Sequence, residues 1–478
     1  MNYKMIRYVL GWVLNIEAFC MILPLICSVL YKDSCTDVFF ICTVICLTIG
    51  IIATSFQPKN KSVYAKEGFV IVALSWILIS AFGALPFYMS GEIENYIDAV
   101  FETVSGFTTT GASILMNVEA LSPSLLFWRS FTHWIGGMGV LVFLIAVLPL
   151  AGGSNLHLIR AESPGPDVGK LVPKVKSTAK WLYVIYLGIT LLQIVFLLLG
   201  RMPLFDALTT TFGTVGTGGF GIKNNSIEGY SPYIQNVITV FMFICGIDFS
   251  LYYLILHKHF KDVWRSDELK AYLGIALSAV ILICVNTFSL FPSLLDCVRH
   301  SAFQVSSIMT TTGFATTDFD KWPQFSKAIL VLLMFCGACA GSTGGGIKVS
   351  RILILIKSVA KEIKIAAHPK RAFKISMSGR LVAHETVRAV TVFLISYILI
   401  YFTSLLIISL DNFSFTTNFT AIAATINNIG PGLEAVGPTQ NFSIFSPLSK
   451  LVLIFDMLAG RLEIFPLLLL FSHQTWKK

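Results

Sequence analysis

Four short polar runs, each ending in a single glycine, recur along this chain of 478 residues. Aligned on their glycines, the four copies share one pattern: a semi-apolar stretch precedes the polar run, and long apolar segments flank the whole unit. A unit that recurs in this way is typical of one structural element used several times around an axis. The four glycines are Gly111, Gly219, Gly313 and Gly430.

The backbone of these runs has the chemistry to bind a cation. Each run ends a segment of roughly 12 residues, or ~18 Å of helix, which is too short to cross a bilayer. Irregular backbone at membrane depth must be buried or line a wet cavity, because lipid cannot satisfy its carbonyl groups. Four such endings around one axis would form a ring of carbonyl oxygens that can replace the hydration shell of a monovalent cation. The negative ends of the four half-helices would point at the same centre, and the glycines let the carbonyl groups turn inward.

Two acidic residues occupy the same position in the first two copies. Asp98 and Asp206 each lie thirteen residues before their glycine. At that distance we expect them to cap the amino end of the half-helix.

The composition places these runs in a membrane protein. Of all residues, 55% are hydrophobic and only 13% are charged, whereas a soluble domain carries about 25% charged residues. The net charge of +9 could suggest a nucleic-acid partner, but the basic residues gather in loops that would all face one side, such as 348–388. The opposite loops, such as 92–98 and 318–320, carry the acidic residues. This is the positive-inside pattern, so we expect cytoplasmic basic loops, cytoplasmic termini, a lipid environment and no nucleic-acid partner.

The apolar segments have the length that membrane-spanning helices need, about 20 residues. Two precede the first copy, and each copy then contributes a span, a short pore segment and a second span. We therefore predict an all-α polytopic membrane protein, with two N-terminal transmembrane helices followed by four helix–pore loop–helix repeats around one central pore. The ten predicted spans are 6–30, 38–56, 67–89, 125–150, 178–200, 232–256, 269–291, 325–355, 386–410 and 447–471, and the four half-spans are 98–110, 205–218, 297–312 and 416–429.

These segments divide the chain into five parts. They are an N-terminal transmembrane helix pair (1–64), a first pore repeat (65–152), a cytoplasmic loop with the second repeat (153–260), a third repeat with a Gly-rich loop (261–357), and a cytoplasmic loop with the fourth repeat (358–478).

The third repeat contains a glycine run, Gly341–Gly346, that interrupts its last apolar segment. Small residues let membrane helices approach closely, so the run could serve helix packing. Four glycines with Ser342 and Thr343 between them would, however, weaken a helix by about 1 kcal/mol per glycine. An unwound, movable loop is the interpretation that this cost favours.

Several motifs, in this order, resemble the Trk/Ktr potassium-uptake family of bacteria, and more closely its TrkH/TrkG branch than its KtrB branch. Beside the four glycine runs, the motifs are Trp134–Gly139, Arg160–Pro166, Gly341–Lys348 and Gly460–Glu463. The resemblance covers nearly the whole chain. It implies potassium uptake across the bacterial cytoplasmic (inner) membrane by a homodimer. It also implies a TrkA-like cytosolic subunit with an RCK fold that binds nucleotide, so that nucleotide acts only through this partner and no cofactor is bound covalently.

The resemblance also assigns roles to individual positions. The Gly-rich run would be an intramembrane gate formed by Gly341, Ser342, Thr343, Gly344, Gly345, Gly346 and Lys348, and Arg461 would be an arginine of the pore. The selectivity filter would bind potassium through the backbone of Thr109, Thr110, Gly111, Thr217, Gly218, Gly219, Thr311, Thr312, Gly313, Asn428, Ile429 and Gly430.

Arg461 lies about 14 residues into its predicted helix, or ~21 Å along it, near the middle of the bilayer. An arginine at that depth costs about 2.5–3.5 kcal/mol on insertion scales, so we expect it to face the protein interior. Asp456 and Glu463 on the same helix are at unfavourable spacings. Two alternatives remain: an ion pair with another helix, or a positive barrier beside the pore.

Other functions are open from the residues alone. A sodium- or proton-coupled cation carrier could use the same scaffold. An intramembrane enzyme would need paired catalytic groups, and Asp248 and Asp456 are the candidate pair; each is equally well explained by a structural hydrogen bond. For His133 and His157 a structural role is expected, and for Cys336 and Cys339 packing rather than metal binding.

Overall fold

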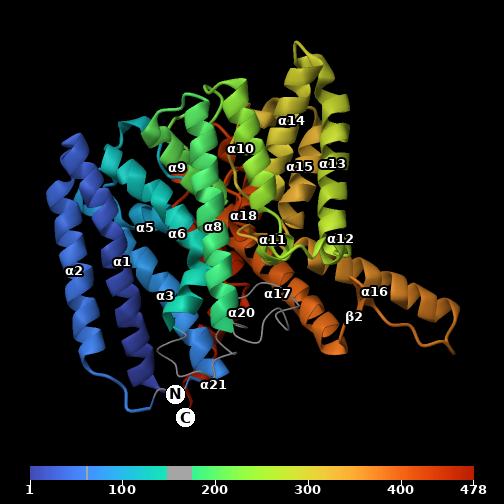
Figure 1. Ribbon diagram of the computed structural model, residues 1–478, viewed down its shortest axis with the longest axis horizontal. Helices are drawn as coiled ribbons and strands as arrows, with labels where there is room; N and C mark the ends of the chain where they lie inside the picture. Colours follow the sequence, from blue (N-terminus) through green and yellow to red (C-terminus); the bar gives the residue numbers. More distant parts are fainter. Residues whose placement is uncertain (61–62, 148–174, 478) are drawn as a thin grey trace.

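The computed structural model describes residues 1–60, 63–147 and 175–477, and these are almost entirely helical (Figure 1). The N-terminal helices α1 (Tyr3–Tyr31) and α2 (Thr36–Ser55) lie side by side at one edge of the molecule. The α1 helix begins where the Asn2 side chain accepts a hydrogen bond from the Met5 backbone N–H. It ends at Lys32, which takes up the left-handed conformation with φ 54° and lets the chain turn back into α2.

Each of the four glycine runs follows a short helix. These four pore helices are α5 (Tyr96–Phe107), α9 (Leu204–Val215), α14 (Leu294–Met309) and α18 (Phe415–Ile426). The helices before them are α3 (Ala65–Gly83) with α4 (Leu85–Met89), α8 (Val175–Leu199), α13 (Asp267–Thr287) and α17 (His384–Ile408). The helices after them are α6 (Pro123–Val147), α10 (Pro232–Cys245) with α11 (Phe249–Leu256), α15 (Gln324–Cys336) with α16 (Val349–Ala367), and α19 (Pro447–Arg461) with α20 (Phe465–Phe471). Smaller elements are α12 (Phe260–Trp264), α21 (His473–Trp476) and a hairpin of β1 (Ser376–Met377) and β2 (Arg380–Leu381).

Three of the helices that follow the pore helices are broken. The prediction of continuous spans at 232–256 and 447–471 is wrong, whereas the break within 325–355 lies at the Gly-rich run, where an unwound loop was expected. The first break bends α10 against α11 by 91°, and Asp248 caps α11 by accepting from the Ser250 backbone N–H at 2.8 Å. The second is the irregular segment 337–348, which contains the Gly-rich run. At the third, Glu463 and Ile464 have φ of 54° and 70°, a conformation that ends a helix.

The breaks reduce the number of continuous spans. Among the described residues, six helices are long and apolar enough to cross a membrane by length and composition, or seven if the bent pair α10 and α11 counts as one. Ten were expected. The segment 325–355 now contributes only the shorter apolar helix Gln324–Cys336. The cytoplasmic loop predicted at the start of the part 153–260, together with His157 and the motif Arg160–Pro166, lies almost wholly outside the described residues.

The capping role predicted for Asp98 and Asp206 is also wrong. Asn95 caps α5 by accepting from the Ile97 backbone N–H, and Pro203 precedes α9. Both aspartates lie in the first turn of their helices, where a negative charge still favours the helix dipole. Asp98 instead pairs with Lys450 of α19 at 2.6 Å, and Asp206 accepts a hydrogen bond from the Tyr230 hydroxyl at 2.8 Å.

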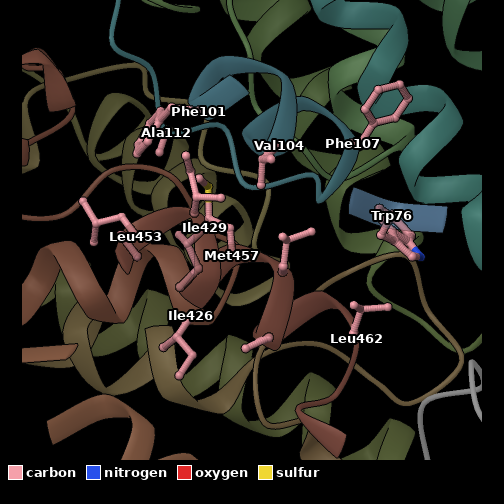
Figure 2. Close-up of a cluster of buried hydrophobic side chains, with 14 of the residues drawn as sticks. Trp76, Phe101, Val104, Phe107, Ala112, Ile426, Ile429, Leu453, Met457 and Leu462 are labelled. Atoms are coloured by element: carbon pink, nitrogen blue, oxygen red, sulfur yellow. The ribbon is translucent and has the colours of Figure 1, made fainter. Parts of the chain in front are cut away.

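The first and last pore helices share one core. Figure 2 shows Val104 and Phe107 of α5 in the same buried cluster as Ile426 of α18 and Met457 of α19. Phe101 of α5 also contacts Phe442, with ring centroids 5.8 Å apart. This packing brings the two ends of the repeat series together, so that the fourth glycine run adjoins the first.

Candidate cation pathway

The four pore helices end in the same backbone conformation. Each helix ends four residues before its glycine, and two positions of each run have positive φ. At the glycines φ is 80°, 78°, 87° and 98° in chain order. Two residues earlier, at Thr109, Thr217, Thr311 and Asn428, φ is 55°, 54°, 59° and 54°. Non-glycine residues rarely adopt this conformation, and such residues gather at functional sites.

The hydrogen bonds of the runs also repeat. In each copy the residue before the glycine donates its N–H to a carbonyl five residues back, at 2.8 Å in all four cases. These donors are Thr110, Gly218, Thr312 and Ile429. The donors of the runs are thus turned back toward their own helices, which leaves the carbonyl groups of the runs available for another partner.

The four runs meet in a closed ring. A Cβ atom on any of the four glycines would clash with the backbone carbonyl oxygen of the residue before another copy's glycine. The pairs follow chain order and close on themselves: Gly111 with Gly218, Gly219 with Thr312, Gly313 with Ile429, and Gly430 with Thr110. The fourth copy adds a side-chain bond, because Asn428 Nδ2 donates to Thr110 Oγ1 at 2.9 Å. The twelve predicted filter residues are therefore brought together, and all are buried or half-buried.

The Gly-rich run lies against this ring. The segment is not helical, so helix packing does not explain its glycines. Gly345 donates its N–H to Thr311 Oγ1 at 2.6 Å, and a Cβ on Gly345 would meet the Asn427 carbonyl. Lys348 folds back and donates to the Gly344 carbonyl. The predicted gate residues thus contact the third and fourth runs directly.

Arg461, the last residue of α19, holds the same segment. Its Nη1 donates to the Thr343 carbonyl at 2.8 Å, and its Nη2 donates to the Gly136 carbonyl of α6 at 2.6 Å. Neighbouring Glu463 pairs with Arg351. The arginine therefore faces the interior, as expected, and it donates to backbone carbonyls of two other elements.

A residue that the sequence analysis missed anchors both ends of the Gly-rich run. Glu268 Oε1, in the first turn of α13, accepts from the Ala340 N–H at 2.7 Å and from the Ser350 N–H at 3.0 Å. The segment is further held at the break in the second repeat, where the Cys339 N–H donates to the Gly246 carbonyl and the Phe249 N–H to the Gly341 carbonyl. The sequence alone gives Glu268 only the ordinary role of an acidic residue in the first turn of a helix, where its charge interacts favourably with the helix dipole.

The remaining candidates have structural partners. His133 donates from Nδ1 to the Gly106 carbonyl at 2.8 Å, and its Nε2 accepts from the Phe220 N–H at 3.2 Å. Asp456 accepts from the Ser404 hydroxyl at 2.8 Å, while Asp248 caps α11. The two aspartates thus bind different partners on different helices. Cys336 and Cys339 are free and buried.

Comparison with known proteins decides the family. The model of the TrkH family, described as cation transport protein, matches residues 36–478. The chain belongs to this family. It is 36% identical to the Trk system potassium uptake protein TrkH of Salmonella typhimurium, with 100% of both chains covered. It is 34% identical to the TrkG protein of Escherichia coli strain K12, covering 100% of this chain and 99% of that one.

A solved structure has the same fold. The crystal structure of the potassium transporter TrkH from Vibrio parahaemolyticus matches with a TM-score of 0.90 and 32% identity, and 100% of each chain is covered. The resemblance inferred from the motifs is confirmed. The protein is a multi-pass membrane protein of a transporter family and not an enzyme.

Proposed function

We propose that the protein takes up potassium across the bacterial cytoplasmic membrane, through one pore whose filter is built from the backbone of the four glycine runs. The observation that carries this proposal is the closed ring of glycine–carbonyl contacts. Carbonyl oxygens around one axis can replace the hydration shell of potassium. The relatives' names, potassium uptake protein and potassium transporter, support the choice of ion.

The Gly-rich run together with Lys348 is proposed to gate this pore from the cytoplasmic side of the filter. Support comes from its irregular backbone and from its bond to Thr311 in the third run. Arg461 serves two purposes in this proposal: it ties the segment to α6 through two carbonyls, and it places a positive charge beside the ion path. The proposed assembly is a homodimer with both termini in the cytoplasm. A cytosolic nucleotide-binding subunit controls it by acting on the gate.

The filter is tested by uptake of potassium, rubidium and sodium into cells that lack other potassium uptake. Replacing Gly313 by Ser adds a Cβ that clashes with the Ile429 carbonyl at a residue with φ of 87°. The preference for potassium over sodium should fall while membrane insertion is retained. The matched control is Gly274→Ser, because a Cβ on Gly274 of α13 meets no atom within 4 Å. An unchanged potassium-to-sodium ratio in the Gly313 variant would contradict the filter.

A further inference from the structure

The α6 helix packs against both the first and the second pore helix, α5 and α9. Two of its side chains, Arg129 and His133, are buried one turn apart, with exposed fractions of 3% and 0%. Residues four apart lie on the same face of a helix. Both side chains therefore lie on one face of α6, the helix that contacts the first and second pore helices.

Arg129 joins the two runs through a buried carboxylate. Its Nε donates to Glu102 Oε1 of α5 at 2.6 Å, and its Nη1 donates to the Gly221 carbonyl, two residues beyond the second run's glycine, at 2.8 Å. The guanidinium also lies over the Phe220 ring, 3.5 Å from its centroid. Three kinds of contact thus tie one side chain to both repeats.

Glu102 holds the backbone that directly follows the first run. Its carboxylate accepts from the Ser113 hydroxyl at 3.0 and 3.1 Å and from the Ile114 backbone N–H at 3.0 Å. Both oxygens are therefore satisfied, and the side chain is 1% exposed. A buried pair with all its hydrogen bonds made is well tolerated, whereas removing one partner leaves an uncompensated buried charge.

His133 makes a second bridge between the same two runs. A carbonyl can only accept, so the ring proton is on Nδ1, toward Gly106 of α5, and Nε2 accepts from Phe220 after the second run. A Cβ on Gly218 would clash with the imidazole ring. The ring therefore supports the backbone of the second run directly.

Within the part of the chain that the structure describes, this arrangement occurs on one side of the ring. Nine residues before the glycine, where the first copy has Glu102, the other copies have Thr210, Gln304 and Ala421. Gln304 is fully buried, and its amide atoms have no hydrogen-bond partner among the described residues. The second and third runs are joined instead by hydrogen bonds of neutral groups, from the Ile227 N–H to the Ala315 carbonyl and from the Ala315 N–H to Ser226 Oγ.

We propose that Glu102, Arg129 and His133 form a brace, a set of positioning residues that fixes the spacing of the first and second runs and so contributes to potassium-over-sodium selectivity. The brace rests on the proposed carbonyl filter. Its hydrogen bonds reach the backbone just behind and beyond the runs, at Gly106, Ile114, Phe220 and Gly221, and the His133 ring also packs against Gly218 of the second run. The three brace residues themselves are not among the twelve filter residues. A looser spacing would let the carbonyl ring adapt to the smaller sodium ion.

The first test is Arg129→Lys, which keeps the positive charge but loses the planar guanidinium with its several N–H donors. A lysine cannot reproduce the Glu102 and Gly221 bonds together with the contact to Phe220. The potassium-to-sodium uptake ratio should fall about tenfold, the lower end of what one hydrogen bond to a charged group is worth. Arg299→Lys is the matched control, because Arg299 pairs with Asp296 on its own helix, α14, and lies fourteen residues before Gly313. Its ratio should stay at the wild-type value.

A charge exchange separates the brace from an ordinary ion pair. In the double variant Glu102→Arg with Arg129→Glu the pair could still form. The Ile114 N–H would nevertheless lose its acceptor, and the Gly221 carbonyl would lose its donor. The brace predicts that the exchange does not restore selectivity, whereas a merely structural pair predicts that it does. Ser113→Ala keeps the proposal testable if these variants do not fold: it removes one hydroxyl donor and should lower the ratio about threefold.

The outcomes distinguish the brace from the filter on which it rests. A wild-type ratio in folded Arg129→Lys and in Ser113→Ala, with a lowered ratio in Gly313→Ser, overturns the brace alone. A wild-type ratio in Gly313→Ser as well overturns the filter and the brace together. A lowered ratio in both Arg129→Lys and Gly313→Ser, with Arg299→Lys unchanged, supports the brace.

Discussion

Removing the side chain of Arg461 is expected to raise the basal potassium flux. The guanidinium joins the Thr343 carbonyl in the Gly-rich segment to the Gly136 carbonyl in α6, at 2.8 and 2.6 Å. In Arg461→Ala both bonds are lost, and so is the positive charge beside the proposed path. The segment would then move more freely, and a passing cation would meet less repulsion.

The size of the effect follows from two contributions. A hydrogen bond to a charged group contributes about 1.5–3 kcal/mol, so the two carbonyl contacts hold the segment by about 3 kcal/mol or more. A cation passing ~6 Å from the charge meets about 3 kcal/mol of repulsion at an effective dielectric constant of 20. Each contribution alone corresponds to a factor of roughly one hundred. Because neighbouring contributions do not add, we expect a rise of about tenfold to a hundredfold.

The assay is rubidium uptake into proteoliposomes, expressed per folded molecule after size-exclusion chromatography. Arg461→Lys should give an intermediate flux, since lysine keeps the charge but cannot bind both carbonyls as the planar guanidinium does. Arg7→Ala is the matched control, because Arg7 also donates to a backbone carbonyl, that of Phe56, but lies in the N-terminal helix pair. Equal flux per molecule in wild type and in well-folded Arg461→Ala would refute both proposed roles of Arg461, the tie between the Gly-rich segment and α6 and the positive barrier beside the path. A lower yield without a rise in flux would indicate a structural role only.

Two further predictions concern the gate. Shortening the segment Gly341–Gly346 should raise the flux per folded molecule and weaken control by the cytosolic partner, whereas a lowered flux per folded molecule would count against gating. Glu268→Ala leaves the Ala340 and Ser350 N–H groups without their acceptor and should raise basal flux about tenfold. Glu268→Gln keeps an acceptor oxygen and should change the flux much less; equal effects of the two substitutions would show that the hydrogen bonds to the segment are not the cause.

Much of the fold could be predicted from local features of the sequence. Apolar length identified the helices because a span must match the bilayer. The four glycines, at one offset from the ends of short helices, predicted four equivalent chain reversals, and the backbone there is nearly the same in all four copies. The helix breaks at Gly246–Asp248 and at Glu463–Ile464 could not be predicted in this way. Their residues carry no strong local signal, and the first is held by the Gly-rich segment of another repeat.

The sequence by itself determined the membrane class, the fourfold repetition and the residues that form the runs, because each depends on local composition and spacing. Only the tertiary structure decided which groups meet. The partners of Arg461 lie 118 and 325 residues away in the chain, and Asn428 reaches Thr110 across 318 residues. Glu102 and Glu268 looked like ordinary acids near a helix. Their roles arise when packing around one axis brings them against backbone N–H groups of segments that no local pattern places beside them.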